Sequence, residues 1–283
     1  MISILQLKDF NKYIDFVWEL GQDQTKSGYP TYTDGIKTKQ DFFNREKAAF
    51  SNENEGILLF TLNGQAEGWI HYCARSQDNY LDTCTFNVRT GISTALEEFI
   101  AYAQEHFPGY ELYLGFPKCN GEAVAYLQEK GFECIEESFN DVLFLNTYKL
   151  LPESPQIVPV TRENFARFRN IHDRIQEQMY WNSDRLFNDL DNWKIYLYEK
   201  NGKAVGAIYY IDEKVMMEVF GVDFLGGVYD KEIFQALLTR ALNEEKKNGA
   251  KYFCFFSDRD SHAACLELGF HSVGEYVCYW KKI

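Results

Sequence analysis

The sequence lacks the patterns that mark disulfide-stabilised, zinc-binding or membrane-spanning proteins. Its seven cysteines are odd in number and widely spaced, and none forms a Cys-x-x-Cys pair, so we expect no disulfide framework and no bound metal. No apolar run approaches the roughly 18 residues of a membrane span, and the N-terminus has no basic stretch followed by a long apolar one. We therefore expect a cytoplasmic protein with reduced thiols and no membrane partner.

Positive charge is also scarce. The chain carries 29 Lys and Arg against 42 Asp and Glu, for a formal net charge of −13. An acidic protein without a basic cluster repels a polyanion, so nucleic acid is not an expected partner. The excess of acidic residues mildly favours a cationic or amine ligand. The sequence predicts no particular oligomeric state.

Hydrophobic residues are plentiful, and four landmarks repeat at one spacing. The chain of 283 residues is 46% hydrophobic, enough for the cores of two domains of about 100–150 residues each. The second member of each pair lies 138 positions after the first: Asn63-Gly64 and Asn201-Gly202, Gly68 and Gly206, Tyr72 and Tyr210, Gly131-Phe132 and Gly269-Phe270. A constant offset indicates an internal duplication. A proline-containing linker from Leu150 to Pro159 predicts domains over residues 1–150 and 151–283.

A glycine turn links an apolar strand to an amphipathic helix in the first half. The apolar run Cys84 to Val88 precedes it, and buried positions of a helix follow with helical spacing at Ile92, Ala95, Leu96, Phe99, Ile100 and Ala103. Free amide groups and the helix dipole make such a helix start a potential phosphate site. The residues that would surround the phosphate are Arg89, Thr90, Gly91, Ile92, Ser93 and Thr94.

The order of predicted elements resembles the GCN5-related N-acetyltransferase (GNAT) family, here in tandem. Arg89 to Leu96 resembles the family's pyrophosphate-binding turn, and Asn120-Gly121-Glu122-Ala123, followed by Gly131-Phe132, resembles its later Asn-x-x-Ala and Gly-Phe motif. The resemblance implies a mixed α/β fold of two GNAT-like domains. It also implies an N-acetyltransferase that uses acetyl-CoA, or a related acyl-CoA, to acylate a small amine. Phe86, Val88, the turn and Asn120 would then hold the cofactor.

The two halves depart from the family pattern in different ways. The tyrosine that often protonates the leaving CoA thiolate would fall at Leu127, with Tyr126 beside it, and at Cys265 in the second half. Asp230 and Glu232 lie where a pyrophosphate would bind in the second half and would repel it. We therefore expect the cofactor in the first half, with the second half as a degenerate copy.

Three residues are candidates for proton transfer. Asp82 and Glu218 could deprotonate the amine, and Tyr126 could protonate the thiolate. Two of them have a simpler interpretation: Asp82 as a surface carboxylate and Glu218 as the outward-facing residue of a strand. His71 could also act as a base, but a hydrogen-bonded sheet residue is its simpler interpretation. A catalytically inactive binding or sensor protein is the main alternative function. Aminoacyl transfer from tRNA also fits the duplication, but it conflicts with the acidic charge.

Overall fold

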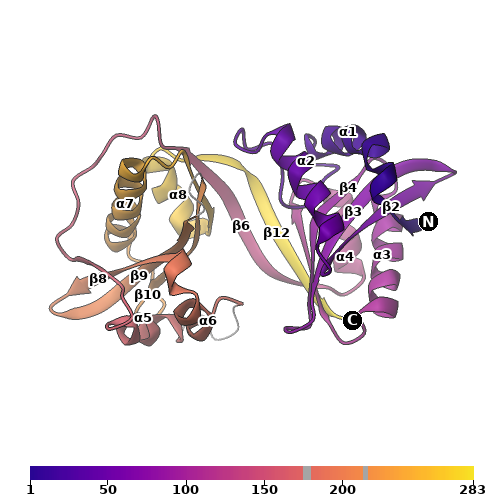
Figure 1. Ribbon diagram of the computed structural model, residues 1–283. Coiled ribbons are helices and arrows are strands. Elements are labelled where there is room, and N and C mark those ends of the chain that lie inside the picture. Colours follow the sequence, from indigo (N-terminus) through magenta and orange to yellow (C-terminus); the bar gives the residue numbers. More distant parts are fainter. Residues whose placement is uncertain (175–179, 213–215) are drawn as a thin grey trace. The chain divides into compact units, whose positions relative to one another are not determined.

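The computed structural model describes residues 1–174, 180–212 and 216–283. It divides into two compact units: unit 1 comprises Met1–Ser138 with Gly274–Ile283, and unit 2 comprises Phe139–Val273. Each unit is a mixed sheet with helices packed on both faces (Figure 1). The expected mixed α/β class is confirmed.

The C-terminal end of the chain belongs to unit 1. Strand β12 (His271–Lys282) pairs antiparallel with β5, from Tyr276 opposite Pro117 to Lys282 opposite Glu111. Strand β6 (Glu133–Phe144) follows helix α4 (Gly121–Glu129). It pairs instead with β11 (Tyr252–Ser257) of unit 2. The division therefore departs from the predicted boundary at residue 150, because each of these two strands crosses from one unit to the other.

Unit 1 has the strand order β1-β2-β3-β4-β5-β12. Its other strands are β1 (Ile2–Ile4), β2 (Glu55–Leu62), β3 (Gln65–Arg75), β4 (Tyr80–Val88) and β5 (Glu111–Pro117). Its helices are α1 (Phe10–Gly21), α2 (Lys39–Ala48), α3 (Ile92–His106) and α4 (Gly121–Glu129). Helices α3 and α4 pack on one face of the sheet, and α1 and α2 pack on the other.

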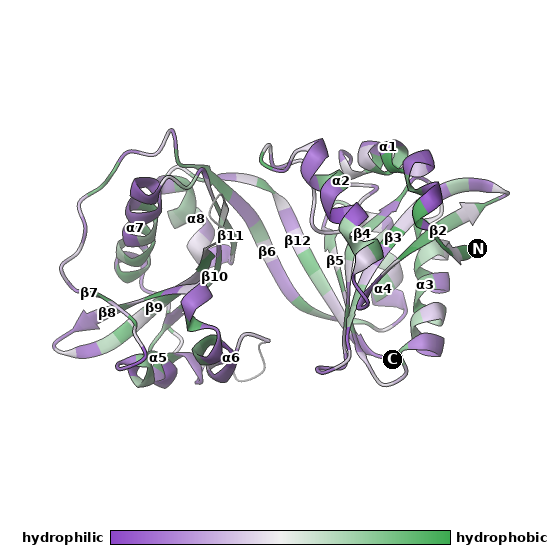
Figure 2. Cartoon of the chain, in the orientation of Figure 1, coloured by the Kyte–Doolittle hydropathy of each residue, from purple (hydrophilic) through white to green (hydrophobic). Residues whose placement is uncertain are grey.

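Helix α3 starts at Ile92, as the apolar periodicity predicts. Its inward positions, Ile92, Ala95, Leu96, Phe99 and Ala103, are all buried. Fully burying a side chain such as Phe99 stabilises the fold by about 1.5–3 kcal/mol, so this stripe fixes the helix on the sheet. Figure 2 shows α3 and α7 with hydrophobic residues along one side and hydrophilic residues along the other.

Unit 2 has the strand order β6-β11-β10-β9-β8-β7. Its further strands are β7 (Ile157–Pro159), β8 (Trp193–Lys200), β9 (Lys203–Asp212), β10 (Met216–Phe224) and β11 (Tyr252–Ser257). Its helices are α5 (Phe165–His172), α6 (Ser183–Asn188), α7 (Lys231–Asn248) and α8 (Arg259–Glu267). Helices α7 and α8 pack on one face, and α5 and α6 on the other.

The predicted landmarks have the same local structure in both units. Asn63-Gly64 and Asn201-Gly202 both adopt positive φ angles, of 51° and 79° and of 53° and 74°, as a two-residue hairpin turn requires. The hairpin around each turn has a register shift at the matching place, directly after Phe60 in the first and directly after Tyr198 in the second. The duplication predicted from the spacing is therefore present in the fold. Within the described ranges, no helix is long and apolar enough to cross a membrane.

Candidate functional site

Parallel strands part at corresponding places in the two units. In unit 1, β4 pairs with β5 only from Tyr80 to Asp82, although β4 continues to Val88. In unit 2, β10 pairs with β11 from Met216 to Val219 and continues to Phe224. We call these places the β4–β5 splay and the β10–β11 splay. Strands that part leave backbone N–H and C=O groups that need other partners.

In unit 1 the chain itself supplies those partners. The Gly28 amide donates to the Phe86 carbonyl at 2.8 Å, and the Val88 amide donates to the Lys26 carbonyl at 2.8 Å. On the other strand, the Tyr29 amide donates to the Gly115 carbonyl at 2.9 Å. Residues 26–29, which we call the plug, therefore bridge both strands of the β4–β5 splay.

Asn120 and Gly28 fit the plug closely into the splay. The buried Asn120 side chain donates to the Ser27 carbonyl at 3.1 Å. A Cβ at Gly28 would lie 3.0 Å from the Phe86 Cβ and 3.3 Å from the Gly115 carbonyl oxygen. Groups of Phe86, Val88 and Asn120, which were predicted to hold acyl-CoA, are thus already bonded to the chain. The expected cofactor site in the first half stays a prediction, and a ligand there would have to displace residues 26–29.

The predicted phosphate turn in unit 1 is present but carries a carboxylate. Gly91 has φ of 76° and directly precedes α3, as expected. The Ser93 amide and hydroxyl both donate to Oε1 of Glu122, at 3.4 and 3.2 Å. The Arg89 guanidinium lies over the Phe16 ring, 4.2 Å from its centroid. A carboxylate at the helix start repels a phosphate, because both are anions.

The other predicted turn residues offer little to a ligand. Thr90 and Thr94 are exposed, and Ile92 is buried in the core. The cofactor residues named in the first half therefore stay a prediction, while the fold around them is as expected.

The proton-transfer candidates of unit 1 lie on opposite faces of its sheet. Asp82 adjoins Leu81, which packs under α3 and α4, so Asp82 faces the α1 and α2 side. Its carboxylate lies 3.4 Å from Arg75, and burial raises its pKa. Tyr126 lies on α4, where burial and then Glu97 raise its pKa. The structure therefore does not bring Asp82 and Tyr126 together.

Leu127 and Cys265 are both fully buried at the position where the family resemblance places a tyrosine. The Phe132 amide donates to the Leu127 carbonyl and the Phe270 amide to the Cys265 carbonyl, so the two positions are structurally equivalent. Leu127 has no proton to donate, and the Cys265 thiol is enclosed by the core. Burial raises the pKa of Cys265 strongly, which keeps it a neutral thiol.

The β10–β11 splay is more open to solvent at its strand end than its counterpart. Gly221 and Val222 are partly exposed, whereas the matching residues Thr85 and Phe86 are buried. The connection from β10 to α7 is also longer, with Leu225 to Val228 exposed. Gly226 and Gly227 have φ of 85° and 72°, a conformation that glycine adopts without strain.

Asp230 acts within this connection as the N-cap of α7. Its carboxylate accepts from the amides of Glu232 at 3.0 Å and Ile233 at 3.1 Å. Asp230 therefore occupies the first amides of α7, the groups that a pyrophosphate would otherwise use. Glu218 is half-buried on β10, and its neighbours Met217 and Val219 pack under α7 and α8. Glu218 consequently faces the α5 and α6 side.

Sequence reasoning missed two tyrosines beside the β10–β11 splay. The hydroxyls of Tyr209 and Tyr229 are both buried without a hydrogen-bond partner. Tyr209 lies across Gly221, where its ring leaves no room for a Cβ. Tyr229 lies in the connection to α7, between the rings of Phe224 and Phe234 at 5.6 and 5.8 Å.

A buried charged network occupies the α1 and α2 side of unit 1. His71 contacts Glu46 through Nδ1 at 3.1 Å and Glu55 through Nε2 at 3.0 Å. Glu46 also accepts from Trp69 and Thr85, each at 2.7 Å. Burial disfavours the charged imidazole, but the two carboxylates outweigh it and raise the pKa of His71. His71 is therefore a hydrogen-bonded sheet residue with both ring nitrogens engaged.

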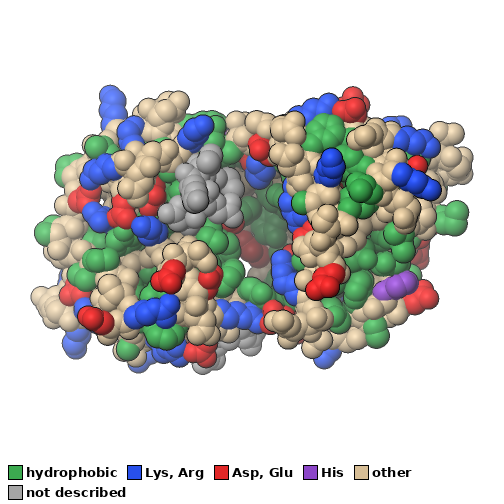
Figure 3. All heavy atoms as spheres, viewed as in Figure 1, with side chains coloured by type: hydrophobic (Ala, Val, Ile, Leu, Met, Phe, Trp, Pro, Cys, Tyr) green, Lys and Arg blue, Asp and Glu red, His purple; other side chains and the backbone are tan. Residues whose placement is uncertain are grey.

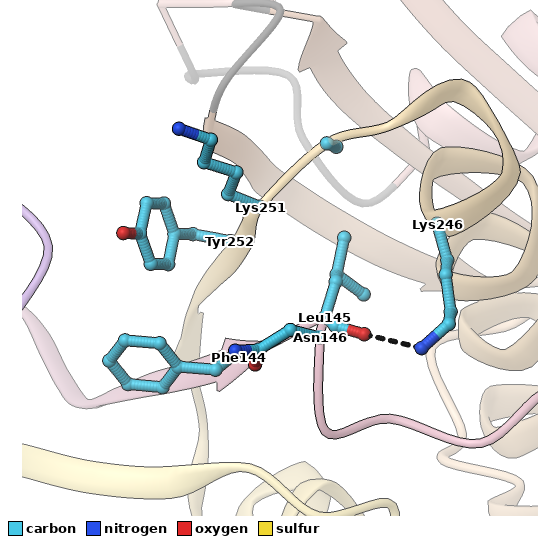
Figure 4. A pocket seen from close by; sticks show the side chains of 7 residues that line it. Phe144, Leu145, Asn146, Lys246, Lys251 and Tyr252 are labelled. Atoms are coloured by element: carbon cyan, nitrogen blue, oxygen red, sulfur yellow. Dashed lines mark hydrogen bonds between the residues drawn. The ribbon is translucent and has the colours of Figure 1, made fainter.

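A separate cavity of about 390 Å³ lies at the other end of β11 (Figure 4). It is lined by Phe144, Leu145, Asn146, Lys246, Ala250, Lys251 and Tyr252. The Lys246 ammonium donates to the Leu145 carbonyl at 2.7 Å, so its charge is used to fix the chain after β6. Tyr252 is the first residue of β11, whereas the splay lies toward Ser257, so this cavity is not part of the splay.

Three solved structures illustrate what the fold resembles. A GCN5-related N-acetyltransferase from Sphaerobacter thermophilus matches with a TM-score of 0.65 and 12% identity, over 100% of this chain and 95% of that one. A tandem GNAT protein from the clavulanic acid biosynthesis pathway matches with a TM-score of 0.54 and 12% identity, over 100% of this chain and 98% of that one. A GCN5-related glucosamine N-acetyltransferase region of a fungal multi-domain GH3 β-N-acetylglucosaminidase matches with a TM-score of 0.61 and 10% identity. The match covers 99% of this chain and 38% of that one.

These matches confirm the predicted fold of two GNAT-like domains in tandem. No protein-family model and no curated protein matches the sequence.

Proposed function

We propose that this chain, which has a tandem GNAT fold, transfers an acyl group from acetyl-CoA or a related acyl-CoA to a small amine. We further propose that the acyl-CoA binds in the β10–β11 splay of unit 2. The observation that carries this placement is the plug: residues 26–29 already fill the equivalent splay of unit 1. The partly exposed strand end at Gly221 and Val222 has the access that a ligand needs.

The residues around the β10–β11 splay fit such a ligand. Gly226 and Gly227 leave the backbone of the connection accessible to a pyrophosphate, and Arg259 is exposed at the first position of α8. The unpartnered hydroxyls of Tyr209 and Tyr229 fit a polar ligand that supplies their missing partners. A bound acyl-CoA would supply the activated thioester. Glu218 is the proposed base that takes a proton from the attacking amine.

A non-catalytic acyl-CoA sensor is the second candidate. It is favoured by the loss of a tyrosine at both Leu127 and Cys265, and by the carboxylate of Asp230 at the start of α7. An aminoacyl-tRNA donor gains no support from the face drawn in Figure 3, where described side chains of both charges are interspersed.

Calorimetric titration with acetyl-CoA tests the placement. Val228→Glu adds a carboxylate to the connection of unit 2, and Thr90→Glu adds one to the matching turn of unit 1. Both positions are exposed, so both substitutions should change stability by less than about 0.5 kcal/mol. We expect saturable binding by the wild type, weakened at least about tenfold by Val228→Glu alone, equivalent to about 1.4 kcal/mol.

The other outcomes have clear meanings. Weakening by Thr90→Glu alone would place the cofactor in unit 1 and require the plug to move. No saturable binding by the folded wild type would refute the acyltransferase proposal. Binding as proposed, with no thiol release from acetyl-CoA in the presence of any amine of a broad panel, would favour the sensor.

A further inference from the structure

A fully buried histidine joins three segments of unit 2. His172 is the last residue of α5, and its side chain is 0% exposed. Its Nδ1 lies 2.7 Å from Oδ2 of Asp223 on β10, and its Nε2 lies 2.9 Å from the carbonyl oxygen of Trp181. The Asp223 side chain is also buried, with 1% exposed. Both ring nitrogens of His172 are therefore engaged inside the protein.

The hydrogen bonds of His172 indicate where its protons lie. A carbonyl oxygen can only accept, so Nε2 carries a hydrogen and donates it to Trp181. At 2.7 Å a hydrogen must also lie between Nδ1 and the Asp223 carboxyl group, because two facing lone pairs would repel each other. The pair thus holds one proton more than a neutral imidazole beside an ionised carboxylate. With that proton the pair has no net charge, which lowers the cost of burying it.

Asp223 lies on the part of β10 that has separated from β11. The last rung between the two strands joins Val219 and Phe255, and residues 221–224 of β10, which we call the parted end, lie beyond it. His172 links Asp223 to α5 and to the segment of Trp181, whose ring packs against Phe220 of β10 with centroids 6.4 Å apart. The imidazole therefore fixes the parted end at the β10–β11 splay.

Unit 1 has a corresponding tie made by a different side chain. Asn87 on β4 pairs with the residue after Gly68, as Asp223 pairs with the residue after Gly206. The Asn87 amide donates to the Val17 carbonyl of α1 at 3.1 Å. Each unit thus ties its parted strand to its first α-helix. The same tie made by different residues in two copies indicates that the parted strand needs this anchor.

We propose that His172 and Asp223 are positioning residues that share one buried proton and hold the parted end of β10 where acyl-CoA binds. Both side chains are enclosed by the chain, so neither touches the ligand. Loss of the tie releases the parted end, and Gly221 and Val222 then no longer hold a fixed position beside the ligand. The positioning role rests on the proposed placement of acyl-CoA in unit 2, whereas the shared proton does not.

Asp223→Asn and Asp223→Ala separate the tie from the shared proton. The amide of Asp223→Asn can donate to Nδ1 of a neutral His172, so the tie remains and the shared proton is gone. Asp223→Ala removes both. In calorimetric titration, Asp223→Ala should bind acetyl-CoA at least about tenfold more weakly than the wild type, and Asp223→Asn should stay within about twofold of it. Wild-type affinity in Asp223→Ala, or an equal loss in Asp223→Asn, would overturn the positioning role.

Asn87→Ala is the matched control, because it removes the corresponding tie from unit 1. It should leave the acetyl-CoA affinity unchanged. A loss equal to that of Asp223→Ala would show a general effect of loosening the fold and would overturn the positioning role. Failure of the folded wild type to bind acetyl-CoA would overturn the proposed function and the positioning role together.

Proton NMR of the ligand-free protein tests the shared proton by itself. A hydrogen held between Nδ1 and a carboxylate should give a resonance downfield of the amide region. His71 and His262 also contact carboxylates, so the resonance of His172 is identified by its loss in both Asp223→Asn and His172→Gln. A wild-type spectrum from which neither substitution removes a downfield resonance would overturn the shared proton, whatever the result with acetyl-CoA.

Discussion

Replacing Gly28 by alanine should loosen the plug that fills the β4–β5 splay. The new methyl group would lie 3.0 Å from the Phe86 Cβ and 3.3 Å from the Gly115 carbonyl oxygen. Neither neighbour is the end of a flexible side chain, and the Gly115 carbonyl also accepts the Tyr29 amide. The substitution therefore forces the plug or a strand to shift.

The size of the effect follows from two opposing contributions. Overpacking a close-packed site costs about 1–3 kcal/mol. An alanine restricts the unfolded chain and returns about 0.4–1 kcal/mol. We expect a net loss of about 1–2 kcal/mol, which is a factor of about 5–30 in the opening equilibrium of the plug.

Amide hydrogen exchange measures that equilibrium locally. Exchange at the Val88 and Tyr29 amides, which bond to and from the plug, should become about 5–30 times faster in Gly28→Ala. Gly121→Ala is the control, because a Cβ there meets nothing within 4 Å. Wild-type exchange rates in Gly28→Ala would show that residues 26–29 do not lie between the strands.

Three further outcomes follow from the buried polar groups. Because the pKa of His71 is raised, its ion pairs stabilise unit 1 fully below the ordinary histidine pKa of 6.5, and this stability is lost as pH rises through the folded pKa. The urea midpoint should therefore fall as pH rises above 6.5. An equal fall of the midpoint in His71→Gln would refute the assignment. Tyr209→Phe should raise the free energy of unfolding by about 1 kcal/mol, because it removes an unpartnered hydroxyl; a decrease in the same denaturation assay would contradict this. Asn120→Ala leaves the Ser27 carbonyl without its side-chain donor and should cost about 1–3 kcal/mol, measured as faster exchange in the plug, whereas an unchanged rate would show that this bond contributes nothing.

Local signals were sufficient to predict the repeated framework. Asn-Gly turns, an apolar stripe from Ile92 and helix ends at Gly131 and Gly269 each depend on a few neighbouring residues. The helical register even separated Tyr126 from Leu127 correctly, because Leu127 is the buried one. Features of this kind repeat at the same spacing whenever the chain repeats.

The contents of each splay could not be predicted in this way. Nothing in the residues around Gly28 indicates that their partners are Phe86 and Gly115, far along the chain. The same applies to β12, which pairs with β5 although the two are distant in sequence. Asn120 matches a cofactor-binding motif locally, yet its side chain donates to Ser27. A sequence motif specifies which side chain can donate, whereas the tertiary fold determines which acceptor lies within hydrogen-bond distance of it.

The duplicated splay presents the same physical requirement in both units, and the described residues show how unit 1 meets it. Strands that part leave backbone groups that need hydrogen-bond partners. Unit 1 meets this requirement with its plug, and its turn from β4 to α3 is reduced to the short stretch Arg89 to Gly91. Unit 2 keeps the longer glycine connection, and both units retain buried polar side-chain atoms without partners, among them Asp82 and Thr83 in unit 1 and Tyr209 and Tyr229 in unit 2. A splay that the chain itself fills needs no ligand to complete it, which is why we propose the β10–β11 splay, with its partly exposed strand end, as the ligand site.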